Sequence, residues 1–222
     1  MSFRELPADI AGTADREPLL RELREFAAVN RIPVLRPDAA ALIRTLTALK
    51  RPARILEAGT AIGYSALLMS CASPASRIET VEIDPDAAVA ARKNIERAGR
   101  SDRIRVILGD AAEVFGALSG PYDMIFLDSA KGQYVRMSDD ILRLLPPGGL
   151  LAADNCIFYG KIFDAPEDAP HKHRTIVANL RAFLSFALES GEFDGTLLGT
   201  GDGVLAAVRR ERPGAGGVKC GT

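Results

Sequence analysis

The stretch RILEAGTAIGYS, residues 54–65, determines the fold that this sequence predicts. Its first half is a short apolar run that ends near the acid Glu57, and two glycines, Gly59 and Gly63, follow closely. A strand followed by a glycine-rich turn and a helix is typical of a parallel α/β sheet, in which ligands bind beyond the carboxyl ends of the strands. We therefore expect an α/β fold with a binding site that begins at this turn.

The following hundred or so residues repeat this alternation of strand and helix. Further apolar runs begin at Arg77, Arg103, Tyr122 and Gly148. The expected helices cover residues 63–71, 85–98, 111–118 and 134–145, with a loop over 156–170 and a last helix after it. Such alternation predicts a parallel sheet that is covered by helices on both faces.

The C-terminal part has a different pattern. Two strand-like runs, from Phe193 and from Val204, flank Gly201-Asp202-Gly203. This tripeptide is typical of a tight hairpin turn, because glycine tolerates positive φ. We expect a doubly wound, Rossmann-like, mostly parallel seven-stranded sheet that ends in a C-terminal antiparallel hairpin.

Length and composition indicate one globular unit. The chain has 222 residues, of which 47% are hydrophobic and 26% charged, and this is enough for one core. We expect a single domain over residues 1–210 with a helical segment at 1–50, followed by a disordered glycine-rich tail at 211–222.

The N-terminal segment predicts two helices. Apolar residues recur at helical spacing over 15–29, and a second helix is expected from an N-cap at Asp38 to Lys50. Two roles are open for the first helix, which are covering the pocket and mediating a homodimer.

Charge and cysteine content exclude several classes of protein. The formal net charge is -1, so nucleic-acid binding would need a local basic patch. No signal sequence and no apolar run of about 20 residues is evident, so we expect a cytoplasmic protein without a membrane partner. The three cysteines lack Cys-x-x-Cys spacing, which favours neither a zinc site nor disulfides.

The turn after the first strand predicts the cofactor. Ala61 stands where a dinucleotide fingerprint has its second glycine, and the acid Glu57 would repel a pyrophosphate. S-adenosylmethionine instead carries an ammonium and a carboxylate, which Glu57 and Ser65 could bind, and Gly59 and Gly63 would let the backbone approach it closely. An NAD-dependent oxidoreductase and a non-catalytic binding module stay open as alternatives.

Two later strand ends extend the cofactor site. Glu82 ends the second run, 19 residues after Gly63, at the position from which a carboxylate usually binds ribose hydroxyls. Asp110 and Ala111, after the third run, would border the adenine. Each acid is alternatively a helix cap, and the glycine turn is alternatively structural.

The next two strand ends predict a metal site. Asp128 ends the fourth run and Asp154-Asn155 the fifth, and adjacent parallel strands bring such side chains together. Two carboxylates and an amide oxygen suit Mg²⁺, which would orient an acceptor hydroxyl and ease the loss of its proton. The charge of that ion disfavours the ammonium form of Lys131, which can then act as general base. Alternatively, the acids are helix caps and Lys131 is a solvated surface charge.

In their order these motifs resemble the metal-dependent class I O-methyltransferases, which include catechol and caffeoyl-CoA O-methyltransferases. The resemblance extends from about Ile32 to Arg209. It implies that Asp128 and Lys131 are catalytic and that Asp128 also borders the cofactor. It further implies metal ligands at Asp128, Asp154 and Asn155, and cofactor contacts at Glu82, Ser65 and the backbone of Leu35.

Within that family, the strings IPVLRP at 32–37 and AKGQY at 130–134 are most similar to bacterial enzymes that methylate 5-hydroxyuridine at the tRNA wobble position. This similarity implies a tRNA partner, with small catechol-like phenols or their CoA thioesters as the alternative acceptors. The cations that could contact phosphates are Lys161, Lys172, Arg174 and Arg181.

Overall fold

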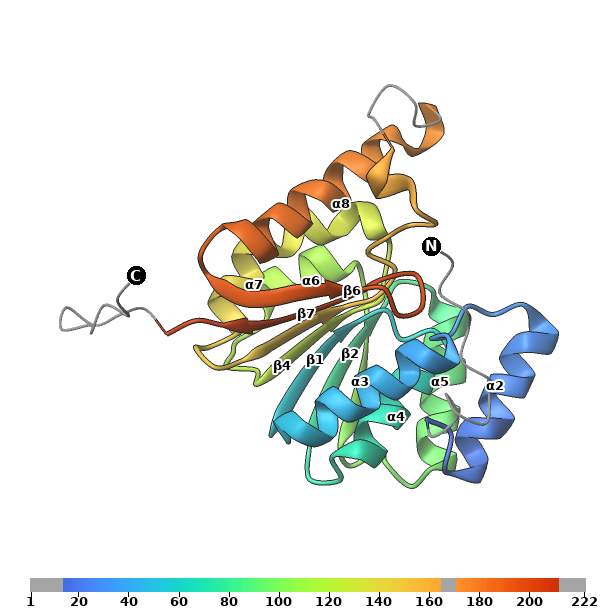
Figure 1. The fold of residues 1–222 in the computed structure, drawn as a ribbon. Helices are drawn as coiled ribbons and strands as arrows, with labels where there is room; N and C mark the ends of the chain where they lie inside the picture. The colour runs from blue at the N-terminus through green and yellow to red at the C-terminus, as the bar shows by residue number, and fades with distance from the viewer. Residues whose placement is uncertain (1–13, 165–170, 212–222) are drawn as a thin grey trace.

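The fold is a single twisted sheet between two layers of helices (Figure 1). The computed structural model describes residues 14–164 and 171–211. Within these ranges seven strands lie in the order β3-β2-β1-β4-β5-β7-β6. Their bounds are β1 Arg54–Ala58, β2 Arg77–Glu82, β3 Ile104–Leu108, β4 Met124–Leu127, β5 Leu150–Ala153, β6 Phe193–Leu198 and β7 Val204–Arg209. Strands β1 to β5 pair in parallel, and β7 pairs antiparallel with both β5 and β6, so the predicted fold is confirmed.

Helices cover both faces of the sheet. In Figure 1, α6, α7 and α8 lie on one face, and α2, α3, α4 and α5 lie on the other. The bounds are α2 Pro18–Asn30, α3 Pro37–Lys50, α4 Tyr64–Ala72, α5 Pro85–Arg97, α6 Ala111–Ala117, α7 Ser138–Leu144 and α8 His171–Glu189. Two short 3-10 helices, η1 Lys131–Met137 and η2 Lys161–Phe163, complete the described elements. None of the helices in these ranges is long and apolar enough to cross a bilayer.

The central strands are buried on both faces, which is why they appear as unbroken apolar runs. All four residues of β4 are buried. Successive side chains of a strand point to opposite faces, so Met124 joins the core under α2 to α5 and Ile125 joins the core under α6 to α8. One apolar run therefore supplies both cores.

The order of the strands reverses beside β1, and this positions the site. Strand β1 lies between β2 and β4, whose connections run in opposite directions across the sheet. A crevice therefore opens at the carboxyl ends of β1 and β4. Gly59 turns the chain there with φ 100°, and a Cβ at this position would lie 2.2 Å from the carbonyl oxygen of Asp128. Glycine is thus required by the close approach of the two strand ends.

Two local predictions were wrong. Asp38 is not the N-cap of α3, because Arg36 is the N-cap and Pro37 occupies the first turn. The expected helix over 134–145 is divided into η1 and α7, and the side chain of Asn179 on α8 donates to the carbonyl of Gly132 within η1. The expected loop over 156–170 contains η2. The predicted disordered tail covers residues 211–222, and all of it after residue 211 lies outside the described part of the chain.

Candidate active site

A cavity of about 1040 Å³ opens at the carboxyl ends of the parallel strands. Most of the predicted site residues contribute to its wall. They are Leu35, Gly59, Ser65, Glu82, Asp110, Ala111, Asp128, Lys131, Asp154 and Asn155. Glu57 and Gly63 do not line it, so their predicted cofactor contacts stay predictions.

The side chain of Glu57 is fully buried beneath this wall. Neither of its carboxyl oxygens has a hydrogen-bond partner that meets normal geometry. Burial raises its pKa to about 7, and the nearby hydroxyls of Ser65 and Thr80 lower it only in part. The cavity therefore has an acid behind its wall that is costly to ionise without a cation nearby.

Asp128 and Asp154 extend the neighbouring strands β4 and β5. Leu127 pairs with Ala153 in the parallel register, so the two aspartates follow at the same level. The N–H of Asp154 donates to the carbonyl of Leu127 at 2.9 Å, which continues the pairing to the strand ends. The predicted convergence of these two acids on one cavity is therefore present.

These two aspartates are electrostatically strained. Burial raises the pKa of Asp154 to about 7, and the nearby carboxylate of Asp128 contributes. Burial also raises the pKa of Asp128, although Lys131 opposes the rise through a contact of 3.1 Å between its Nζ and Oδ1 of Asp128. Oδ1 of Asp154 is buried and has no hydrogen-bond partner. Both side chains would be stabilised by a shared cation.

Asn155, which follows Asp154 in the chain, is the third candidate metal ligand. Its backbone lies in the left-handed region at φ 55°, which asparagine tolerates better than most residues. No group of three or more His, Cys, Asp or Glu side chains gathers anywhere in residues 14–164 and 171–211. The predicted set of two carboxylates and one amide oxygen fits a hard, weakly held cation such as Mg²⁺ better than zinc.

Tyr134 fixes the two strand ends, and the sequence did not predict this role. Its buried hydroxyl lies 3.1 Å from the carbonyl oxygen of Leu127 and 3.3 Å from that of Asp154. The ring packs edge-on against Phe183 of α8 with centroids 5.3 Å apart. A signal was present in the spacing, since Tyr134 follows Lys131 by three residues, but periodicity alone does not distinguish such a contact from core packing.

The cofactor end of the cavity has acids of another kind. Oε2 of Glu82 accepts from the N–H of Ala61 at 2.8 Å, and Oε1 accepts from the N–H of Asp84 at 2.9 Å. Asp110 is the N-cap of α6, and its Oδ1 accepts from the N–H of Ala112 at 2.8 Å. Glu82 and Asp110 are therefore held in place by backbone amides before any ligand binds.

The C-terminal hairpin closes the end of the cavity where Asp154 and Asn155 lie. Oδ2 of Asp38 accepts from the N–H of Gly201 at 2.8 Å, which is the role of Asp38 in place of capping. Oδ1 of Asp202 accepts from the N–H of Tyr159 at 2.7 Å, and the N–H of Cys156 donates to the carbonyl of Gly203 at 2.8 Å. The loop after Asn155 is thus bound to the hairpin turn.

The profile of a family described as O-methyltransferase matches residues 11–210 of this sequence. The chain belongs to the O-methyltransferase family. A catechol O-methyltransferase of Niastella koreensis is 38% identical over 60% of this chain and 63% of its own length. A catechol O-methyltransferase of Mycobacterium tuberculosis is 37% identical over 52% of this chain and 54% of its own. The matched part thus spans less than two thirds of either relative.

A solved methyltransferase of this fold shares the arrangement. The structure of the Podospora anserina methyltransferase PaMTH1, bound to S-adenosylhomocysteine, superimposes with a TM-score of 0.80 and 25% identity. The superposition covers 95% of this chain and 98% of that one. The α/β architecture with its mixed seven-stranded sheet is therefore that of class I methyltransferases.

A second cavity of about 620 Å³ adjoins Lys131 and Asn155 in this O-methyltransferase fold. Its wall includes Phe158, Tyr159 and Asn179, and the Tyr159 side chain is 81% exposed. Lys131 and Asn155 line both cavities, so the candidate base and one candidate ligand lie where the two meet.

Two of the predicted phosphate-binding cations, Arg181 and Lys161, make contacts within the described residues. Arg181 donates from Nε and Nη2 to the carbonyl of Ile162 at 2.9 and 2.7 Å, so its guanidinium holds the chain after η2. Nζ of Lys161 lies 5.0 Å from the centroid of the Phe158 ring. Arg174 is exposed, and the side chain of Lys172 lies outside the described part of the structure.

Proposed function

We propose that this chain is an S-adenosylmethionine-dependent O-methyltransferase that uses a divalent cation and acts on a small aromatic acceptor with two neighbouring oxygens. The observation that carries the proposal is the pair of carboxylates on adjacent strand ends, Asp128 and Asp154. They share a cavity wall, and Oδ1 of Asp154 has no partner. A divalent cation would stabilise a pair of this kind, and two vicinal oxygens are the acceptor geometry that a single cation can chelate.

The larger cavity supports the choice of cofactor. Ser65 lies at the start of α4, where backbone N–H groups favour a carboxylate. The Glu82 carboxylate is held by two backbone amides, which leaves lone pairs to accept hydrogen bonds from ribose hydroxyls. Ala61 in place of a second glycine and the buried Glu57 both disfavour a pyrophosphate, and so disfavour the NAD alternative.

This chain's own residues would prepare the acceptor for methyl transfer. Asp128, Asp154 and Asn155 would hold the cation, which supplies Lewis-acid activation when bound. Lys131 contacts Asp128 and lines both cavities. From there it would act as the general base that takes a proton from an acceptor hydroxyl at the junction of the two cavities.

The second cavity favours a small phenol over tRNA. Its aromatic wall at Phe158 and Tyr159 suits a flat ring, and the two relatives named above are catechol O-methyltransferases. Wobble 5-hydroxyuridine offers comparable vicinal oxygens, so tRNA is the second candidate acceptor. Arg181 already donates to a backbone carbonyl, so it is less available for the phosphate contact that tRNA binding would require.

The decisive experiment offers both acceptors to the same enzyme preparation. Purified protein is incubated with methyl-labelled S-adenosylmethionine and Mg²⁺, with either a catechol or tRNA that carries 5-hydroxyuridine, and with EDTA in a parallel series. We expect label in the catechol and its loss with EDTA. Label in tRNA alone would reverse the order of the two acceptors, and labelling unaffected by EDTA would overturn the cation.

Calorimetry separates the methyltransferase from the two other classes. The protein is expected to bind S-adenosylhomocysteine and not NAD. Asp154→Asn is expected to retain that binding and to lose transfer, whereas a non-catalytic binding module would show no transfer in either form.

A further inference from the structure

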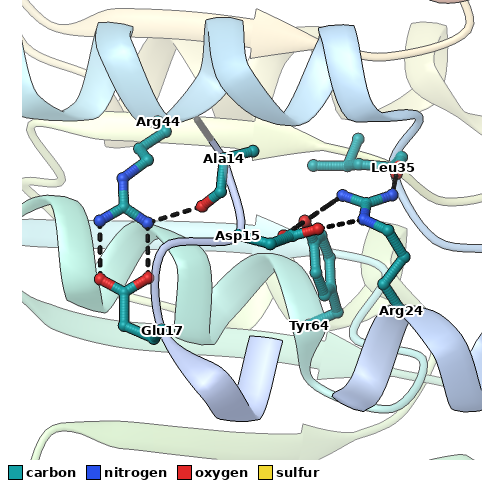
Figure 2. A network of polar contacts seen from close by, with 7 residues as sticks. All are labelled: Ala14, Asp15, Glu17, Arg24, Leu35, Arg44 and Tyr64. Atoms are coloured by element: carbon teal, nitrogen blue, oxygen red, sulfur yellow. Dashed lines mark hydrogen bonds and ion pairs between the residues drawn. The ribbon is translucent and has the colours of Figure 1, made fainter. Parts of the chain in front are cut away.

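Two arginines attach the N-terminal segment to the rest of the fold (Figure 2). Arg24 of α2 and Arg44 of α3 each pair with an acid that precedes α2, and each also donates to a backbone carbonyl. Their side chains are 21% and 14% exposed. The two arginines are similar in charge, burial and number of contacts. They differ in whether the residues that they contact line the larger cavity.

The contacts of Arg24 lead to the larger cavity. Its Nη1 donates to the carbonyl of Leu35 at 2.7 Å, its Nη2 donates to the hydroxyl of Tyr64, and its Nε pairs with Asp15. The guanidinium carbon also lies 4.7 Å from the centroid of the Tyr64 ring. Figure 2 shows the guanidinium between Asp15, Tyr64 and Leu35.

Both residues that Arg24 joins to α2 belong to the cavity wall. Leu35 lies in the segment 31–36, which lines the cavity, and Tyr64 lies between Gly63 and Ser65 at the start of α4. Arg24 itself does not line the cavity. One guanidinium thus bridges two segments of the cavity wall.

Tyr64 is a suitable anchor because it is rigid and remains protonated. Its side chain is 1% exposed, so its ring cannot change position without opening the core. Burial and the hydrogen bond to Asp15 raise its pKa well above the usual value, so the hydroxyl donates to Asp15 while it accepts from Arg24. Each of the three side chains in the cluster of Asp15, Arg24 and Tyr64 therefore forms hydrogen bonds with the other two.

We propose that Arg24 is a positioning residue for the cofactor cavity, which couples the packing of α2 to cofactor binding. The inference rests on the proposed function, because the ligand of this cavity is taken to be S-adenosylmethionine. Coupling of this kind is reciprocal, so a bound cofactor must also stabilise α2. Arg24 does not contact the reacting atoms, so we expect its loss to change the affinity for the cofactor and not the rate of methyl transfer.

Arg44 provides the matched control. It forms a two-pronged pair with Glu17 at 2.8 and 2.7 Å and donates to the carbonyl of Ala14 at 2.8 Å. Neither Glu17 nor Ala14 lines the cavity. Loss of Arg44 therefore loosens the same N-terminal segment without releasing a cavity wall.

The test measures the dissociation constant for S-adenosylhomocysteine by calorimetry in wild type, Arg24→Gln and Arg44→Gln, together with the melting temperature. Removal of a charge-assisted hydrogen-bond network is expected to weaken binding at least about tenfold in Arg24→Gln. Arg44→Gln is expected to lower the melting temperature comparably and to change affinity less than about twofold. With saturating acceptor and varied cofactor, KM for the cofactor is expected to rise in Arg24→Gln while kcat stays within about twofold.

Hydrogen exchange supplies a readout that does not depend on activity. In wild type the amides of α2, residues 18–30, are expected to gain protection when S-adenosylhomocysteine binds, and in Arg24→Gln this gain is lost. Tyr64→Phe keeps the ring and removes the hydroxyl, so it tests the same cluster if Arg24→Gln folds poorly, with an expected loss of affinity of about threefold to tenfold.

The outcomes separate this inference from the proposed function. If wild type binds no S-adenosylhomocysteine, the proposed function fails and the inference fails with it. If wild type binds it, and Arg24→Gln and Arg44→Gln weaken binding equally or not at all, the inference alone is overturned.

Discussion

The four acids that the sequence predicted for the larger cavity fall into two groups that look alike in the sequence, since each lies at or just after the end of a strand. At the cofactor end, Glu82 and Asp110 accept hydrogen bonds from backbone amides. At the proposed metal end, Asp128 contacts the ammonium of Lys131, and Asp154 keeps a buried oxygen without a hydrogen-bond partner. The first group is stabilised by the fold itself, and the second would be stabilised by a bound cation.

The difference shows what each end can bind. A carboxylate that already accepts hydrogen bonds from backbone amides can also accept them from neutral hydroxyls, and its stability does not depend on a bound cation. A buried carboxylate pair without partners gains most from a full positive charge. One cavity can therefore hold a neutral ribose at one end and a cation at the other.

The largest expected effect is at Asp154. Asp154→Asn replaces a charged cation ligand with a neutral amide and removes a buried negative charge, so transfer should fall by about a hundredfold or more while the melting temperature rises. Steady-state kinetics and calorimetric melting check the two directions. Asp110→Asn is the control from the other group, since asparagine is an equally good N-cap. A loss of activity in Asp110→Asn as large as that in Asp154→Asn would remove the distinction.

The next effect is a dependence of stability on pH. The pKa of Glu57 is 4.5 in its usual state and about 7 in the fold, so the folded protein holds a proton that the unfolded chain releases. Its favourable contribution is full below about pH 4.5 and is lost as pH rises through about 7, a change of about 3 kcal/mol. Urea unfolding of the ligand-free protein at pH 5 and pH 8 measures this change. Glu57→Gln should reduce the dependence and leave the part that Asp154 and Asp128 contribute in the same direction, and an unchanged slope would show that Glu57 does not contribute.

A smaller effect is expected at Glu82. Glu82→Gln puts an amide NH₂ where two backbone N–H groups now donate, so one of those contacts becomes donor against donor. Affinity for S-adenosylhomocysteine should fall about tenfold with little change in cation affinity. Paired titrations with cofactor and with Mg²⁺ show whether the two ends are independent. Equal losses in both titrations would contradict the division of the cavity.

The smallest effect is expected at Tyr134. Tyr134→Phe keeps the packing against Phe183 and removes the hydroxyl that lies beside the carbonyls of Leu127 and Asp154. We expect a loss of about 1 to 2 kcal/mol in unfolding free energy and a several-fold fall in kcat, because the two strand ends are less well fixed. Denaturant unfolding and kinetics measure both, and an unchanged kcat would limit Tyr134 to a structural role.

The sheet could be predicted because local pattern and global burial agree there. Runs such as residues 124–127 are apolar throughout because both faces are covered, and the sequence around Gly201 has one obvious turn. The acids at the strand ends could be predicted for the same reason, since parallel strands end at one edge. The sequence could not predict whether each acid has a hydrogen-bond partner, because that depends on where individual backbone amides point.

Contacts between distant residues account for what the sequence missed. Arg24 reaches Leu35 and Tyr64 across 11 and 40 positions, and no periodicity marks such a pair. The N-cap was misplaced because Pro37 takes the first helical position and moves the helix start ahead of Asp38. The division of the helix at 131–144 involves Asn179, which lies 47 positions away from Gly132.

The hydrogen bond between Asp38 and Gly201 joins residues 163 positions apart and closes the proposed metal end of the cavity with the last hairpin of the sheet. A ribosome must therefore release nearly all of the described chain before this end of the cavity can form. Contacts of such long sequence separation also form late in refolding, because the entropy of closing the loop opposes them. The chain should gain its cofactor end early and its capacity for catalysis last.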